Sequence, residues 1–192
     1  TLISGGEMAA PGNWQQEKEG IKDDVETFYN DILKGGDNEG DPALIRVLAE
    51  NALNAAHWLR DDVQVTFEDY MLFFGGHSVM RSLVPLNASG VELIQKLNAK
   101  AEAVGAVIHK NTAATELVMT DGRVNAVKAT FNGQEITYTA NKGVILATGG
   151  FGSNPKYMEQ YLPLFADGFS STNAGATGDG ITMTARFGTK VI

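Results

Sequence analysis

The sequence predicts an α/β fold in which helices surround a three-stranded antiparallel β-meander. Apolar residues recur at helical spacing through the first half of the chain. After Gly105 the period changes, and Asp121-Gly122 and Asn132-Gly133 separate three extended stretches, as expected for tight hairpin turns. A later run, Val144-Ile145-Leu146, has no polar alternation, which is typical of a strand covered on both faces. These patterns together indicate a mixed helix and sheet architecture.

The first two predicted helices begin at acidic capping residues. Asp23, with Glu26 three residues later, is expected to cap a helix that stops near Lys34-Gly35-Gly36. Asp41-Pro42 is expected to open the next helix, because proline fits the first helical turn. This second helix is predicted to bury one apolar stripe, formed by Leu44, Val47, Leu48, Ala52, Ala55, Trp58 and Leu59.

The middle of the chain is expected to contain a long loop, a helix and a short strand. Residues 70–89 lack periodicity and are predicted to form the loop. A capping box at Ser89-Gly90-Val91-Glu92 predicts an amphipathic helix that Gly105 ends. Residues 106–109 are predicted to form a short apolar strand.

The second half is expected to contain the meander, a covered strand and a helix. The three meander strands are predicted at 115–120, 124–131 and 134–139. One face of their sheet is expected to be covered and the other to be more exposed to solvent. Asn154-Pro155 then predicts the start of a helix.

Composition excludes several classes of function. A net charge of −8 with 15 Lys plus Arg argues against nucleic-acid binding. The chain has no cysteine, and its three histidines are scattered, so we expect no metal site. No apolar run reaches the length of a transmembrane segment. A chain without cysteine fits a reducing or an oxidising compartment, and a cytoplasmic location is the preferred expectation.

Three clusters of small residues are candidates for ligand binding. Glycines let a backbone approach a planar or phosphorylated ligand closely and offer its N–H groups as donors. Any one cluster alone is better explained as a turn, whereas all three together favour a ligand. The clusters are residues 4–10 (SGGEMAA), 147–150 (ATGG) and 175–180 (GATGDG).

Several longer stretches resemble the FAD-binding domain of the fumarate reductase and succinate dehydrogenase flavoproteins, especially soluble flavocytochrome c type fumarate reductases and urocanate reductases. The resemblance implies a partial Rossmann-like FAD-binding domain of the glutathione-reductase-like type. The stretches, in order, are SGGEMAA, LKGGDNEGDPALIRVLAENA, GGHSVMRS, HKNTAATEL, VILATGGFGSN and STNAGATGDGI.

The resemblance also implies which residues hold FAD. The first cluster would run beside the flavin ring and ribityl chain, and the later residues would lie along the adenosine and pyrophosphate. The implied cofactor residues are Thr1, Ser4, Gly5, Gly6, Met8, Ala114, Ala147, Thr148, Gly149 and Asp179.

One further group has the chemistry to meet an anionic substrate. His77, Ser78 and Arg81 place an imidazole, a hydroxyl and a forked donor within five residues. The alternative is a surface loop in which Arg81 is solvated.

By this resemblance, residues 1–192 are the central part of one FAD-binding domain. The GxGxxG dinucleotide motif would precede them, while the capping region with the proton-donating arginine and most substrate-binding residues would follow. The parent would be an FAD-dependent oxidoreductase that reduces an activated C=C bond, with fumarate the first candidate substrate. Urocanate, another enoate or a ketosteroid remain alternatives, and no catalytic residue is expected within this chain.

A second hypothesis is that the isolated chain is a structural domain that binds no FAD and has no activity. In that case it is expected to fold with its exposed edges covered in a homo-oligomer. The expected partner of the parent enzyme is a small dicarboxylate or enoate, and its electron donor is unidentified.

Overall fold

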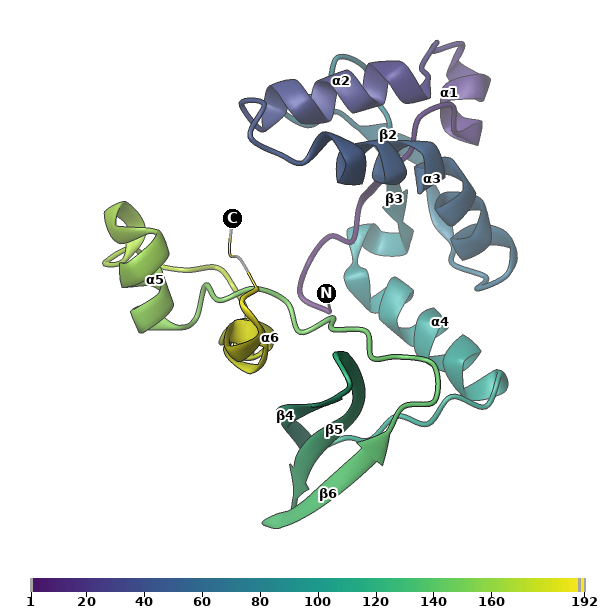
Figure 1. Ribbon diagram of the computed structural model, residues 1–192. Coiled ribbons are helices and arrows are strands. Elements are labelled where there is room, and N and C mark those ends of the chain that lie inside the picture. The colour runs from purple at the N-terminus through teal and green to yellow at the C-terminus, as the bar shows by residue number, and fades with distance from the viewer. Residues whose placement is uncertain (1, 190, 192) are drawn as a thin grey trace. The chain divides into compact units, whose positions relative to one another are not determined.

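The computed structural model describes residues 2–189 and 191, and it divides into two compact units (Figure 1). Unit 1 is Thr1–Ile108 and unit 2 is His109–Ile192. No helix in the described part of the chain combines the length and apolarity needed to cross a membrane. The assignment of residues 1–192 to one domain stays a prediction, because each unit has its own internal packing.

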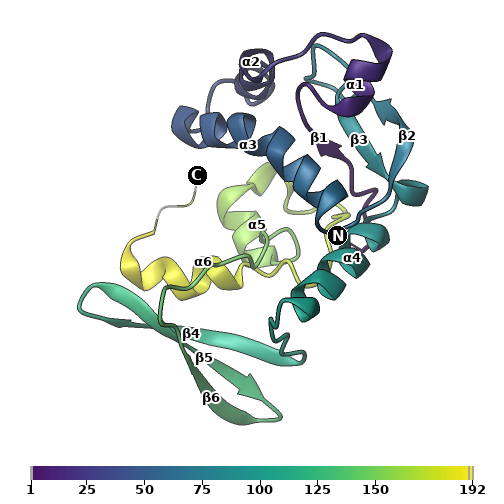
Figure 2. The same ribbon diagram turned by 90° about the vertical axis from the view of Figure 1, so that its right-hand side faces the viewer.

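Unit 1 contains a small antiparallel sheet with strand order β1-β3-β2, visible in Figure 2. Its strands are β1 (Met8–Ala9), β2 (Phe67–Leu72) and β3 (Ser82–Pro85). The prediction of one long loop over residues 70–89 was therefore wrong at both ends. β3 is four residues long, includes a proline and is buried at every position, so it shows no alternation that a sequence pattern could detect.

Four helices pack around this sheet, and their caps differ in part from those expected. Asp24, and not Asp23, caps α2, accepting a 2.7 Å hydrogen bond from the Thr27 backbone N–H. Ser89 caps α4 as predicted, but the Glu92 carboxylate accepts from the Thr66 N–H at 2.9 Å. The helices are α1 (Trp14–Glu19), α2 (Val25–Gly35), α3 (Pro42–Asp61) and α4 (Gly90–Ala103), and a 3₁₀ turn, η1 (Leu86–Ala88), precedes α4.

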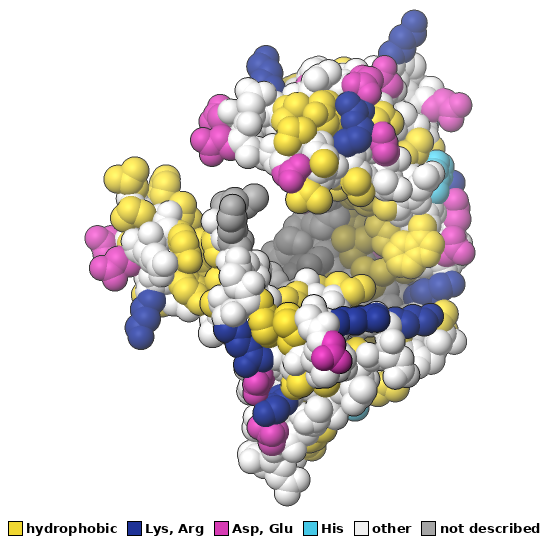
Figure 3. Space-filling view, viewed as in Figure 1, with side chains coloured by type: hydrophobic (Ala, Val, Ile, Leu, Met, Phe, Trp, Pro, Cys, Tyr) yellow, Lys and Arg dark blue, Asp and Glu magenta, His cyan; other side chains and the backbone are white. Residues whose placement is uncertain are grey.

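α3 begins at Asp41-Pro42 as predicted, but the predicted buried stripe was wrong for its large side chains, and Ala52 is its one buried member. Leu44 is 67% exposed and Trp58 is 46% exposed, whereas the buried face carries mainly alanines and Ile45. Ala49 and Ala52 pack against Phe28 of α2, because small side chains allow two helices to approach closely. Figure 3 shows hydrophobic side chains that remain exposed at the surface of α2 and α3.

Unit 2 contains the predicted meander, with strand order β4-β5-β6 (Figures 1 and 2). Its turn residues Asp121, Gly122, Asn132 and Gly133 all have positive φ, which confirms the hairpin prediction. Register shifts interrupt the expected alternation of faces between β4 and β5. The elements of unit 2 are β4 (Thr112–Thr120), β5 (Arg123–Phe131), β6 (Gln134–Thr139), α5 (Pro155–Tyr161), η2 (Pro163–Phe165), α6 (Asp179–Thr184) and η3 (Ala185–Phe187).

Two predicted strands are absent from the described residues. Residues 106–109 and Val144–Leu146 carry no strand pairing, and Ile145 is 93% exposed, so the prediction of a covered strand was wrong here. A strand requires a hydrogen-bonded neighbour, and neither apolar segment has one among the described residues.

The burial of Leu83 predicts its contribution to the stability of unit 1. Leu83 is 0% exposed and packs with Ala10, Ala56 and Met71. We expect Leu83→Ala to lower the free energy of unfolding by about 2–5 kcal/mol, because truncation leaves a cavity in a packed core.

Urea denaturation of the 192-residue chain, followed by tryptophan fluorescence, measures this effect, since Trp14 and Trp58 both belong to unit 1. Leu44→Ala is the matched control, with an expected change within about 0.5 kcal/mol at an exposed position. Equal destabilisation by the two variants would contradict the core described above.

Candidate functional site

Unit 2 brings two of the three glycine clusters together. The Gly178 backbone N–H donates to the Gly150 carbonyl at 3.1 Å, and Gly180 lies directly against the Thr148 hydroxyl. A hollow of about 420 Å³ opens beside this contact. Its lining residues are Leu146, Thr148, Gly149, Gly150, Phe151, Gly180, Ile181, Thr184, Thr189 and Val191.

Glycine occupies the positions at this contact for different physical reasons. Gly178 has φ +78°, and a Cβ there would come within 2.6 Å of the Tyr157 ring, so local packing explains this residue. Gly149 also has a positive φ of +74°, but a Cβ there would meet no atom within 4 Å. A Cβ at Gly150 would likewise meet no atom within 4 Å, so the backbone of Gly149 and Gly150 leaves open space next to the hollow, where a ligand could lie.

The backbone beside the hollow offers hydrogen-bond donors. The N–H groups of residues 147–150 donate to no acceptor in the described part of the chain, and these residues are exposed. Leu146, Phe151 and Ile181 add apolar walls. This combination of open glycine backbone, free amides and apolar surface fits a ligand with both a flat ring and polar groups, as FAD has.

Two other predicted cofactor residues of unit 2 lie on its surface. Ala114 is an exposed residue of β4, opposite Ala129 of β5. Asp179 is exposed at the first position of α6, and its carboxylate accepts a 2.7 Å hydrogen bond from the Thr177 hydroxyl. Both positions can be reached by a ligand from solvent.

The predicted flavin loop, residues 4–8, belongs to unit 1. The Ser4 carbonyl accepts a 2.7 Å hydrogen bond from the Gly90 N–H. Gly6 has φ +77°, and a Cβ there would come within 3.0 Å of both Gly90 Cα and Leu93 Cδ1, so packing requires a glycine at this position. Met8 begins β1, whereas Thr1 lies outside the described residues.

The three candidate substrate residues occupy different environments. Ser78 is exposed and His77 is half-buried, and both line a small hollow of about 270 Å³ with Asp31 and Lys34. The Arg81 side chain is 0% exposed, so the alternative of a solvated Arg81 was wrong. Its burial also keeps the guanidinium away from any ligand in solvent.

Arg81 is held by two carboxylates. Its Nε and Nη2 donate to the two oxygens of Asp23 at 2.8 and 3.0 Å, and its Nη1 donates to Asp31 Oδ2 at 2.6 Å. Ser78 donates to the same Asp31 oxygen from its N–H and its hydroxyl. The guanidinium also lies over the Phe28 ring, 4.9 Å from its centre.

This buried network explains the titration behaviour of its members. Burial raises the pKa of Asp31, but hydrogen bonds from Ser78 and Arg81 outweigh it and lower the pKa below the ordinary value of 3.8. Burial, and then the charge of Arg81, lowers the pKa of His77 below its ordinary value of 6.5. His77 is therefore neutral at neutral pH, and its buried Nδ1 has no hydrogen-bond partner among the described groups.

Sequence reasoning missed four residues of this network: Asn13, Gln16, Asp23 and Asp31. Asn13 and Gln16 form a capping box at the start of α1, and an Asn-x-x-Gln pattern was available as a signal for it. Gln16 also donates to Asp23 Oδ2 at 2.9 Å and to the Met80 carbonyl at 2.8 Å. No sequence signal connects Asp23 or Asp31 with Arg81, which lies 58 and 50 residues away.

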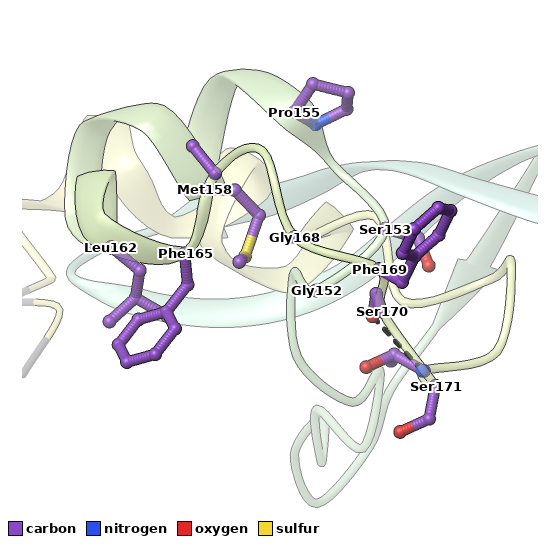
Figure 4. Close-up of a pocket in the computed structure, with 12 residues that line it drawn as sticks. Gly152, Ser153, Pro155, Met158, Leu162, Phe165, Gly168, Phe169, Ser170 and Ser171 are labelled. Atoms are coloured by element: carbon purple, nitrogen blue, oxygen red, sulfur yellow. Dashed lines mark hydrogen bonds between the residues drawn. The ribbon is translucent and has the colours of Figure 1, made fainter.

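Unit 2 also has a second hollow, of about 470 Å³, between α5, η2 and residues 168–172 (Figure 4). Met158, Leu162 and Phe165 supply apolar walls, and Ser170 accepts a hydrogen bond from the Thr172 N–H. No acidic or basic side chain lines it, so it offers no group for proton transfer. Across the described residues, no group of three or more His, Asp or Glu could hold a metal ion.

The chain is similar to several known proteins. The family model described as "FAD binding domain" matches residues 1–192. The chain is 43% identical to urocanate reductase from Eggerthella lenta over 100% of its own length and 32% of that protein. It is 35% identical to a protein named as a probable fumarate reductase from Shewanella frigidimarina, covering 98% of this chain and 32% of that protein.

A solved flavocytochrome c3 fumarate reductase in its open conformation matches with a TM-score of 0.89 and 34% identity, over 96% of this chain and 33% of that one. The chain thus spans about a third of the length of the curated relatives it matches.

The lowered pKa of Asp31 predicts a pH-dependent contribution to stability. Its carboxylate stabilises the folded state fully above pH 3.8, and this contribution is lost as the pH falls below 3.8 through the folded-state pKa. Asp31→Asn removes the titration. We therefore expect the stability gap between wild type and Asp31→Asn to shrink as the pH falls below 3.8.

Urea titrations at each pH, read by tryptophan fluorescence, measure the gap. Other carboxylates titrate in both proteins, so the difference isolates Asp31. A gap that is unchanged down to pH 2.5 would contradict the ionised Asp31 of this network.

Proposed function

The chain belongs to the FAD-binding domain family, and we propose that it forms part of an FAD-dependent oxidoreductase that reduces a C=C bond activated by a carboxylate. The observation that carries this proposal is the open glycine backbone at Gly149 beside the hollow of unit 2. The match of the family model to residues 1–192 supports it.

We assign the cofactor contacts residue by residue. Ala147, Thr148 and Gly149 would line the adenosine side of FAD through their backbone, with Ala114 and Asp179 as further contacts of unit 2. Ser4, Gly5, Gly6 and Met8 would hold the flavin side from unit 1, together with Thr1. When bound, FAD supplies hydride transfer, while the chain binds and orients the cofactor.

The names of the relatives support a substrate class. Urocanate and fumarate, the substrates that those names give, share a C=C bond conjugated to a carboxylate. We therefore propose a small dicarboxylate or enoate substrate, with fumarate and urocanate as the two candidates. His77 and Ser78 stay proposed substrate contacts. The proton-donating arginine is expected outside this chain.

The full-length protein tests this proposal directly. We expect the purified protein to show a resolved flavin absorption spectrum and to release FAD on denaturation. After anaerobic reduction, addition of fumarate or urocanate should reoxidise the flavin, and the faster substrate identifies the preferred one. A colourless protein that gains no flavin spectrum with added FAD would overturn the proposal.

A second candidate concerns the 192-residue chain by itself. The exposure of Ile145 and the unpaired backbone of Val144–Leu146 favour a chain that folds but holds no FAD without further contacts. Equilibrium dialysis of the isolated chain against FAD, in parallel with the full-length protein, measures this difference. Equal affinity of the two proteins would exclude the second candidate.

Two glycines with the same backbone angle give a sharp test of the cofactor site. Gly149 and Gly188 both have φ +74°, and a Cβ at either position would meet no atom within 4 Å. Alanine at each should cost about 1–2 kcal/mol of stability, because the left-handed region is strained for residues with a Cβ.

Only Gly149 is a proposed FAD contact. In the full-length protein we expect Gly149→Ala to raise the Kd for FAD about tenfold or more, since a Cβ would stand between backbone and cofactor, and a loss of about 1.4 kcal/mol is tenfold. Gly188→Ala should leave the Kd unchanged. Titration of apoprotein with FAD, followed by flavin fluorescence, measures both, and equal Kd values for the variants would count against the site.

A further inference from the structure

Arg81 connects the two carboxylates of the buried network to the strand that precedes α1. Its main-chain carbonyl accepts hydrogen bonds from the Ala10 N–H at 3.3 Å and from Asn13 Nδ2 at 3.1 Å. The next two residues, Ser82 and Leu83, pair with β1. The position of Arg81 therefore sets where β1 lies.

β1 is too short to fix its own position in the sheet. It has two residues and two pairs with β3, Met8 with Leu83 and Ala9 with Ser82. Register is weakly specified in so short a strand, and a slip by one residue would turn Met8 to the opposite face. The contacts of residues 10–16 with residues 80 and 81 supply the missing constraint.

The acidic partners extend this constraint to α2. Asp23 precedes α2 and Asp31 lies within it, and both are bonded to the same guanidinium. Gln16 is fully buried and bonds to Asp23 and to the Met80 carbonyl. The guanidinium thus holds two carboxylates, one just before α2 and one within it, in a single geometry, while the main-chain carbonyl of the same residue holds residues 10 and 13.

We propose that Arg81 is a positioning residue for the flavin loop, residues 4–8. This inference rests on the proposed function, since it assigns the loop to FAD. Arg81 fixes β1, which begins at Met8 where the loop ends, and its side chain is fully buried, so it would act on FAD only through the loop. A geometric role also explains the use of a buried ion pair, because an apolar core of the same volume is often as stable.

Arg81→Lys in the full-length protein tests the proposal. Lysine keeps the positive charge, but its single ammonium group cannot form the bidentate contact with Asp23 and the contact with Asp31 at the same time. We expect the Kd for FAD to rise about tenfold, the effect of roughly 1.4 kcal/mol. We also expect the midpoint potential of the bound flavin to shift, because the displaced loop would lie beside the flavin ring.

Two controls separate positioning from stability. Arg46→Lys alters an arginine of α3 that is bonded to Glu26 of α2 at the surface, so the Kd and the potential should stay at wild-type values. Val65→Ala alters a buried residue of unit 1 outside the network. It should lower the Tm and leave the flavin potential unchanged.

Asp31→Asn provides a second variant that keeps the side-chain shape if Arg81→Lys does not fold. It weakens one contact to Arg81 and leaves Asp23 in place, so a smaller rise in Kd and a smaller potential shift are expected.

The outcomes distinguish this inference from the proposed function. Wild-type protein without flavin would overturn both. Wild-type protein with flavin, and a folded Arg81→Lys or Asp31→Asn variant with unchanged Kd and potential, would overturn the positioning role alone.

Discussion

The buried ion pairs of Arg81 are the constraint on which the arrangement of unit 1 depends. The side chains of Arg81 and Asp23 are both 0% exposed, so each charge requires the other to compensate for its loss of hydration. Asp31 accepts a further hydrogen bond from Arg81, while Ser78 donates to Asp31 and Gln16 donates to Asp23. The loop before β3 and the start of α2 can therefore occupy only positions that satisfy this set.

The glycines differ in the reason for which a side chain is excluded. At Gly6 and Gly178 neighbouring atoms fill the space that a Cβ would take, so the residue is required by the packing of each unit. At Gly149 that space is open, and the adjoining amides are exposed. An open position such as Gly149 leaves room for a ligand, whereas Gly6 and Gly178 do not, and the sequence alone does not show this difference.

Local signals in the sequence predicted the elements that depend on local contacts. The Asp121-Gly122 and Asn132-Gly133 turns specify the meander, because their positive φ angles join neighbouring strands directly. Asp41-Pro42 and Asn154-Pro155 likewise specify helix starts, because the Asp41 and Asn154 side chains accept hydrogen bonds from the first backbone N–H groups of each helix. The resemblance to FAD-binding domains also came from contiguous stretches, and the family match over residues 1–192 confirms it.

Contacts between distant segments could not be predicted in this way. The buried face of α3 was misplaced because alanines packed against α2 exclude water as fully as leucines would, while the larger apolar side chains stay exposed. The sequence analysis grouped Arg81 with the candidate substrate residues, because no sequence pattern indicates an ion pair between residues that are 58 positions apart.

The sequence by itself determined the meander turns, the helix starts at Asp41 and Asn154, and the family, because each of these depends on neighbouring residues. Only the tertiary structure decided which polar side chains are buried and which glycines stay open, because burial depends on segments that meet after folding.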